Sequence, residues 1–176
     1  MDRAAVLSPF SRFAEAEEAL AAGLPVSCRI VGSPEELAVH FAIREAVFVG
    51  EQGFFEGTDR DDHDGDPATL HVLGLFGRVA GGAVRLYPLE KPGLWKGDRL
   101  AVLPAFRKHG LGAPLVRFAV GTAAERGGEV MVAYIQPRNV GFFENLGWYR
   151  VGEVEPYVGR PHQQMAIDLR QVSPGS

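Results

Sequence analysis

The chain has 176 residues, of which 46% are hydrophobic and 23% are charged, with a formal net charge of −4. This is the composition of an ordinary globular protein, and the length suits one domain with a sizeable core. The acidic balance implies no nucleic-acid partner, and no apolar stretch approaches membrane-spanning length. The single cysteine, Cys28, excludes an internal disulfide, and the first residues lack a secretory signal pattern, so we expect a cytoplasmic protein.

The first quarter of the chain predicts a peripheral extension followed by a strand and a helix. Residues 1–25 are expected to form an N-terminal extension with a short helix that ends before Gly23. Residues 26–31 are typical of a strand. Ser33-Pro-Glu-Glu is a capping box with proline at the first helical position, and it predicts a helix that directs Leu37, Phe41 and Phe48 to the core.

Residues 50–67 predict a long polar connection that contains Asp59-Arg-Asp-Asp-His-Asp-Gly-Asp. This stretch fails as a calcium loop, because counting back from Gly65 puts Arg60 at the first ligand position and His71 at the last. We interpret it as a solvated acidic loop. The alternative is that it attracts a cationic amine substrate.

The remainder of the chain alternates strand and helix patterns. Residues 69–76 and 79–86 predict a hairpin, and residues 88–97 a turn-rich loop. A strand over 100–103 precedes a glycine turn and a helix that ends at Gly127-Gly128. The strand expected at 129–134 should lie parallel to 100–103 through a right-handed crossover. A short helix over 139–146, strands over 148–154 and 164–169, and a C-terminal tail over 171–176 complete the prediction.

The stretch from residue 100 to 112 has the features of an anion site. Pro114 fits only the first turn of a helix, so this helix should begin near Gly110 or Leu111. The N–H groups of about residues 110–113 then lack helical acceptors, and the positive end of the helix dipole favours a phosphate there. Gly110 and Gly112 allow a ligand to approach the backbone closely. The basic residues at positions 107–109 add positive charge at the rim.

The sequence Arg-Lys-His-Gly-Leu-Gly at residues 107–112 resembles the R/Q-x-x-G-x-G/A loop of the GNAT acyltransferases, which holds the pyrophosphate of acetyl-CoA. The preceding Arg-Leu-Ala-Val-Leu-Pro resembles that family's fourth strand, which lies along the pantetheine arm. The element order matches the family over roughly residues 26–170. The resemblance therefore implies an α/β (α+β) GNAT fold, with a mixed, mostly antiparallel sheet, a splayed central parallel strand pair, and helices on both faces.

Further segments resemble a narrower branch of that family. Asn-Val-Gly-Phe-Phe-Glu-Asn-Leu-Gly-Trp at 139–148 is similar to the family's N-x-x…F-Y-E-x-L-G-F segment beside the cofactor thiol. The motifs Val-Phe-Val-Gly-Glu-Gln at 47–52 and Pro-His-Gln-Gln-Met at 161–165 resemble the ElaA-like proteins and the acetyltransferases linked by name to nitrogen starvation.

The resemblance implies N-acetylation by direct attack of a primary amine on the thioester of acetyl-CoA in a ternary complex. The oxyanion needs an N–H donor, and a backbone amide of the strand over 101–103 is the candidate. Many relatives protonate the leaving thiolate with a tyrosine, but Phe143 occupies that position here. Tyr134 or Tyr157 can take this role, or the thiolate can leave unassisted, because a thiol pKa near 8.5 makes the anion a tolerable leaving group.

Three side chains are candidates for the base that deprotonates the amine. Glu51 follows the first helix on the acceptor side, with a surface carboxylate or a loop-fixing hydrogen bond as the alternative role. His162 is a candidate whose alternative role is structural. His71 is better explained as a core or edge residue than as a catalytic one.

The sequence thus predicts a cosubstrate site for acetyl-CoA, a catalytic set of Glu51, His162 and Tyr134, and no metal site. The partners are acetyl-CoA and an amine, without nucleic acid or membrane, in a monomer or homodimer. The alternatives are a non-catalytic acyl-CoA-binding module or sensor, and an acyl-homoserine-lactone-synthase-like enzyme, since Arg44-Glu-Ala-Val-Phe48 resembles the R-x-x-V-F segment of those enzymes. The expected cofactor-binding residues are Leu100, Ala101, Val102, Arg107, Lys108, His109, Gly110, Leu111, Gly112, Ala113, Asn139, Phe142 and Phe143.

Overall fold

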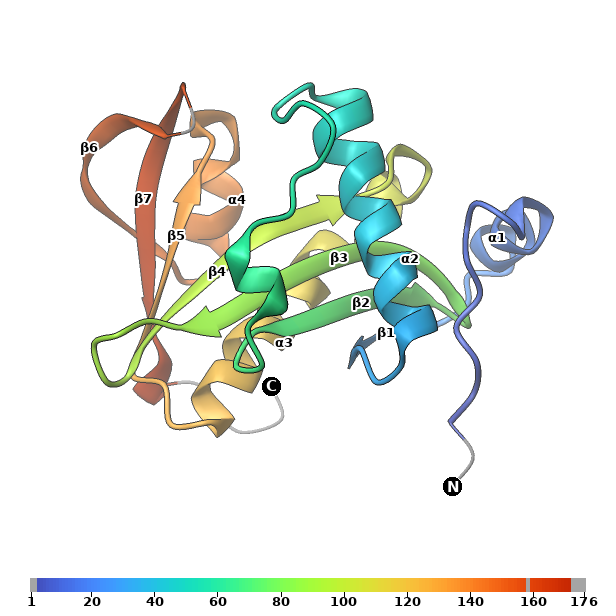
Figure 1. The fold of residues 1–176 in the computed structure, drawn as a ribbon, viewed down its shortest axis with the longest axis horizontal. Helices are drawn as coiled ribbons and strands as arrows, with labels where there is room; N and C mark the ends of the chain where they lie inside the picture. The colour runs from blue at the N-terminus through green and yellow to red at the C-terminus, as the bar shows by residue number, and fades with distance from the viewer. Residues whose placement is uncertain (1–2, 158, 172–176) are drawn as a thin grey trace.

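The computed structural model, which describes residues 3–157 and 159–171, is a seven-stranded mixed sheet with helices on both faces (Figure 1). The sheet order is β1-β2-β3-β4-β5-β7-β6, and every neighbouring pair is antiparallel except β4 and β5. The strands are β1 (Val26–Ile30), β2 (Leu70–Phe76), β3 (Val79–Pro88), β4 (Leu94–Val102), β5 (Val130–Ile135), β6 (Tyr149–Tyr157) and β7 (Arg160–Asp168). This is the architecture that the resemblance implied.

The helices divide between the two faces of the sheet. Helix α2 (Pro34–Arg44) crosses one face over β3 and β4, and α3 (Gly112–Glu125) packs against the other (Figure 1). Helix α4 (Val140–Asn145) lies near β5 and β7, and α1 (Phe13–Ala21) lies at the far edge beside the β2–β3 end. Among the described residues, no helix has the length and hydrophobicity needed to cross a bilayer.

The N-terminal segment contacts the sheet, since Leu7 forms a parallel bridge with Val79. The domain boundaries remain predictions. Residues 172–176, most of the predicted tail, lie outside the described part of the chain.

Helix α2 begins where the sequence predicted, and the Ser33 hydroxyl accepts the Glu36 N–H at 3.1 Å. The prediction of its core face is confirmed for Phe41, which is buried, and is wrong for Leu37. Leu37 and Phe48 are only half-buried, whereas Ile43, Val47 and the side chains of His40 and Arg44 are buried. The sequence pattern could not identify this face, because it carries two polar side chains whose burial depends on partners distant in the chain.

Strand β4 begins at Leu94, within the predicted loop over 88–97. Its first half pairs with both neighbours, through Tyr87↔Lys96 in β3 and Lys96↔Val132 in β5. The predicted partnership of residues 100–103 with β5 is therefore wrong in register. The parallel pairing covers only Leu94–Lys96, and the two strands have separated by the time β4 reaches residue 100.

Glycines in β2 and β3 allow α3 to lie close against the sheet. A Cβ on Gly82 would meet the Leu115 side chain at 2.8 Å, and one on Gly81 would meet the Phe106 ring at 2.5 Å. Phe106 and Leu115 flank the turn that leads into α3, and both are buried. Close packing at these glycines thus fixes the position of the glycine turn at residues 110–112.

Candidate active site

The separation of β4 and β5 opens a cavity of about 160 Å³. It continues from the sheet toward α3 and α4 on one side and toward the chain that follows α2 on the other. No backbone pairing fills the gap beyond Lys96 and Val132, so side chains line it instead. The lining residues include Phe48, Phe54, Phe55, Asp98, Arg99, Leu100, Val116, Ala119, Ala133, Tyr134, Asn139, Phe143, Tyr157 and His162.

The predicted anion loop lies at the N-terminus of α3. A 3-10 segment, Pro104–His109, ends at Gly110, whose φ of 76° is in the left-handed region. Helix α3 begins at Gly112, within two residues of the prediction. Its first bond runs from the Leu115 N–H to the Leu111 carbonyl at 3.2 Å, so the preceding N–H groups have no helical acceptor. No side chain caps this end, because the cap position is the aliphatic Leu111.

Basic and aromatic side chains surround this loop. Arg107, Lys108 and His109 are exposed at its rim. The ring of Phe142 approaches from α4, within 3.5 Å of where a Cβ on Gly112 would lie. Phe143, at the family's tyrosine position, is buried against Trp148, with ring centroids 5.4 Å apart. The Asn139 side chain makes no capping hydrogen bond to α4, and this residue lines the cavity.

Glu51 and Arg107, predicted for different roles, form a two-point ion pair. Arg107 Nη1 donates to Glu51 Oε2 at 2.7 Å, Nη2 donates to Oε1, and Nε donates to the Val102 carbonyl at 3.0 Å. The hydrogen bond from Arg107 holds the pKa of Glu51 below its ordinary value. In this state the carboxylate is a weaker base than an unpaired glutamate.

His162 lies at the other end of the cavity and is buried. Its Nδ1 is 2.9 Å from the Arg160 carbonyl oxygen, which can only accept, so Nδ1 carries the proton in the neutral ring. Among the described residues, Nε2 makes no hydrogen bond, and its lone pair is available to a substrate. The ring packs edge-on to Tyr157 at 5.4 Å and to Phe54 at 5.9 Å.

Tyr134 and Tyr157 stack beside His162, with ring centroids 4.6 Å apart. Lys96 Nζ donates to the Tyr157 hydroxyl oxygen at 3.1 Å and lies 5.2 Å from the centre of each ring. Burial alone would lower the pKa of Lys96, but its hydrogen bond with Tyr157 and the nearby charge of Asp98 raise it. A charged lysine therefore contacts one of the two phenols that face the cavity.

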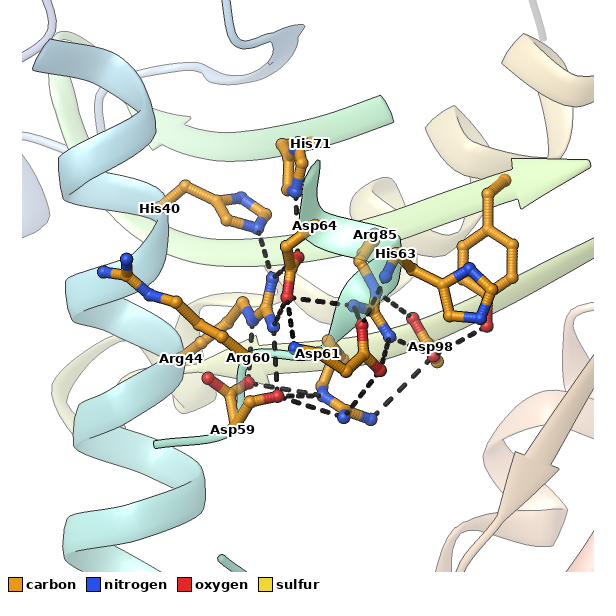
Figure 2. A network of polar contacts seen from close by, with 12 residues as sticks. His40, Arg44, Asp59, Arg60, Asp61, His63, Asp64, His71, Arg85 and Asp98 are labelled. Carbon is orange, nitrogen blue, oxygen red and sulfur yellow. Dashed lines mark hydrogen bonds and ion pairs between the residues drawn. The ribbon is translucent and has the colours of Figure 1, made fainter. Parts of the chain in front are cut away.

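A network of ion pairs fixes the polar connection against α2 and the sheet (Figure 2). Arg44, fully buried, donates to Asp59 at 2.7 Å and to Asp64 at 2.8 and 3.1 Å. Arg85, also fully buried, donates to both oxygens of Asp61 and both of Asp98 at 2.6–3.1 Å.

The interpretation of residues 59–66 as a solvated acidic loop is wrong for Asp59 and Asp64, which are buried against arginines. Burial alone would raise the pKa of Asp64, but hydrogen bonds from His71 and Arg44 hold it far below its usual value. Sequence reasoning missed this network because its arginines lie on α2 and β3 and its acids elsewhere. The only sign of the network in the sequence was the repetition of aspartates over residues 59–66.

The network ends at the cavity wall. Arg99 has a φ of 54°, unusual for a residue with a side chain, and lines the cavity. Its guanidinium donates to the Asp59 carbonyl at 3.0 Å and lies 4.6 Å from the Phe55 ring centre. The strained backbone of Arg99 is thus held by the same acids that hold the polar connection.

Comparisons with known proteins agree with this geometry. The sequence model of the Acetyltransferase (GNAT) family matches residues 39–148. "Putative acetyltransferase BSU40680" of Bacillus subtilis (strain 168) is 32% identical over 138 residues, covering 77% of this chain and 91% of that protein.

Two solved structures share the fold. The crystal structure of Escherichia coli ElaA has a TM-score of 0.73 at 23% identity and covers 82% of this chain and 100% of its own. An aminoglycoside 6'-N-acetyltransferase complexed with coenzyme A has a TM-score of 0.66 at 17% identity, covering 83% and 97%. With the family match over most of its length and the B. subtilis relative, this chain belongs to the acetyltransferase (GNAT) family and is an acyltransferase.

Proposed function

We propose that the protein transfers an acetyl group from acetyl-CoA to a primary amine by direct attack within a ternary complex. One observation carries the proposal: the cavity between β4 and β5 reaches Val116 of α3, about one turn from the uncapped start of that helix and its glycines at 110 and 112. A diphosphate fits the helix end, and a thioester arm fits the gap between the strands. The family uses this donor class, and the solved relative with coenzyme A has the same fold.

The cofactor residues divide into two groups. The loop from Arg107 to Ala113 binds the diphosphate through backbone N–H groups and through the positive charges of Arg107 and Lys108. Strand residues 100–102 lie along the pantetheine arm, with Asn139, Phe142 and Phe143 on the side of α4. A diphosphate bound to this loop would compete with Glu51 for Arg107, and it would thereby release the Glu51 carboxylate from its ion pair.

Of the backbone amides in the strand over 101–103, one is the best candidate for the oxyanion donor. The Leu103 N–H donates to the Gly81 carbonyl at 3.0 Å, so it is already occupied. Amides alternate sides along a strand, so the Val102 N–H faces away from β3, toward the gap left by β5. We assign Val102 as the donor that stabilises the negative charge on the thioester oxygen during attack.

His162 is the best-placed base. Its Nε2 takes the proton of the attacking amine nitrogen as the new C–N bond forms and the C–S bond breaks. Tyr157 gives its hydroxyl proton to the departing sulfur, and Lys96 stabilises the phenolate that remains. Tyr134, stacked on Tyr157, is the alternative donor. Glu51 stays a candidate base only in the state in which Arg107 has moved to the diphosphate.

A reducing compartment such as the cytoplasm suits this chain. Burial raises the pKa of the Cys28 thiol to about 11, so it is protonated and takes no part in acyl transfer. We infer a monomer or homodimer with no nucleic-acid or membrane partner.

Calorimetry with acetyl-CoA and a thiol-release assay across an amine panel test the proposal. We expect binding and turnover. Binding without thiol release would favour the acyl-CoA-binding module, and absence of binding would exclude the assigned cofactor site.

The base is tested by His162→Gln, which should lower kcat by roughly 10²-fold. His63→Gln, a change at an exposed histidine, is the matched control and should retain the wild-type kcat. Equal kcat values in the two variants would rule out His162 as the base.

A further inference from the structure

The acceptor end of the cavity is built from aromatic rings. Phe48, Phe54 and Phe55 come from the segment that follows α2, and Tyr157 and His162 come from β6 and β7. Figure 1 shows the segment after α2 descending in front of β4, between α2 and the β5–β7 strands. An amine that reaches the thioester from this side must pass its substituent between these rings.

Two carboxylates at this end, Asp98 and Asp61, are already paired with arginines. Asp98, which lines the cavity, accepts two hydrogen bonds from Arg85 at 2.7 Å. Asp61 is held by Arg85 and lies 3.4 Å from Arg99. A cationic acceptor would compete with these arginines for each acid, which is unfavourable because it weakens the pairing of the fully buried Arg85.

The outer aromatic faces are covered by positive charge. Arg99 lies over the Phe55 ring at 4.6 Å, and Arg160 lies over the Phe54 ring at 4.2 Å. Arg160 also donates to the Gln52 carbonyl at 3.3 Å, which holds this segment against β7. A guanidinium group of the protein therefore already lies over the face of each ring, and that face is not open to a second cation.

We infer that the acceptor is a primary amine carried on an apolar body, most simply an aromatic one, with no second positive charge. The inference rests on the proposed function. The apolar surroundings lower the pKa of a bound amine by desolvation, which assists His162 in producing the neutral nucleophile. The rim arginines select against diamines and polyamines. Exposed Glu153 and Glu155, which line a second cavity of about 260 Å³ beside Tyr157 and His162, are the groups that oppose this selection.

The first experiment compares kcat/KM for ethylamine, butylamine, phenethylamine and 1,4-diaminobutane with acetyl-CoA. We expect an increase of at least tenfold from ethylamine to phenethylamine, since one added methylene in an apolar pocket is worth roughly 10- to 200-fold. Diaminobutane, which is butylamine with a second ammonium, should be at least about tenfold worse than butylamine. A flat series, or a diamine that equals butylamine, would overturn the inference.

Binding of the same amines to the CoA-loaded protein by calorimetry separates the two proposals. Tighter binding of phenethylamine than of diaminobutane, with no turnover of any amine, would support the acceptor class while the proposed function fails. Tighter binding of diaminobutane would overturn the acceptor class whatever the turnover.

Charge variants test the role of the rim. Arg160→Glu should raise the ratio of kcat/KM for diaminobutane over butylamine by about fivefold or more, and Arg160→Lys should retain the original ratio because it retains the charge. Arg126→Glu, the same change at an exposed arginine at the end of α3, should leave the ratio unaltered. An Arg160→Glu ratio equal to that of Arg126→Glu would refute the selection by charge.

Discussion

Gly110→Asp should weaken acetyl-CoA binding without unfolding the protein. Gly110 has a φ of 76°, and no heavy atom outside its chain neighbours lies within 4 Å of a Cβ built there. The substitution therefore costs only the left-handed backbone strain, about 1 kcal/mol for a residue such as aspartate, or roughly 2–4 °C in Tm. A carboxylate about 4 Å from a phosphate adds repulsion of about 1–4 kcal/mol, or roughly a fivefold to thousandfold loss of affinity.

Gly127→Asp supplies the matched control at the other end of α3. Gly127 also has a positive φ, 87°, and equally open surroundings. Aspartate there opposes the helix dipole, so this control should be destabilised at least as much as Gly110→Asp. Calorimetry should find wild-type acetyl-CoA affinity in Gly127→Asp and an affinity at least about fivefold lower in Gly110→Asp. Equal affinities in the two variants would refute the placement of the diphosphate.

Three further predictions concern the ion pairs and the tyrosines. Glu51→Gln should strengthen acetyl-CoA binding about two- to fivefold by calorimetry, because an exposed ion pair worth up to about 1 kcal/mol no longer competes for Arg107; unchanged affinity with a flattened pH–rate profile would instead favour Glu51 as the base. The depressed pKa of Asp64 stabilises the folded state fully above about pH 4, and this contribution is lost as the pH falls further. Asp64→Asn should therefore lower the free energy of unfolding by roughly 3–5 kcal/mol at pH 7, and its denaturation midpoint should depend less on pH between pH 4 and 2 than that of the wild type. Midpoints of variant and wild type that fall in parallel with pH would contradict this. Tyr157→Phe should lower kcat more than Tyr134→Phe, because only Tyr157 contacts Lys96, and steady-state rates showing the reverse order would make Tyr134 the proton donor.

The strand and helix order and the glycine turn were predictable because they depend on local patterns. The apolar run placed the end of β4 and Pro114 placed the start of α3, and the structure agrees with both positions to within two residues. The start of β4 at Leu94 was not predictable, because that half of the strand is stabilised by pairing with β3 and β5 rather than by its own composition.

The charged core escaped prediction for a different reason. Their charge assigns Arg44 and Asp64 to solvent, since burial of a charge is unfavourable without a partner. The partners lie 15 to 24 residues away along the chain for the Arg44–Asp59 and Arg85–Asp61 pairs. No local signal specifies such a pairing. The pairing of Glu51 with Arg107, 56 residues apart, was not predictable for the same reason.

The ion-pair network has a consequence for how this enzyme can acquire new acceptors. Replacement of Asp59 or Asp64 removes one of the two carboxylates that pair with the fully buried Arg44, so substitutions there disrupt folding before they alter substrate choice. Phe54 and Phe55 lie a few residues upstream and bear no such constraint. Divergence among close homologues, and laboratory selection for new amines, should therefore concentrate at these two rings and leave the aspartates intact.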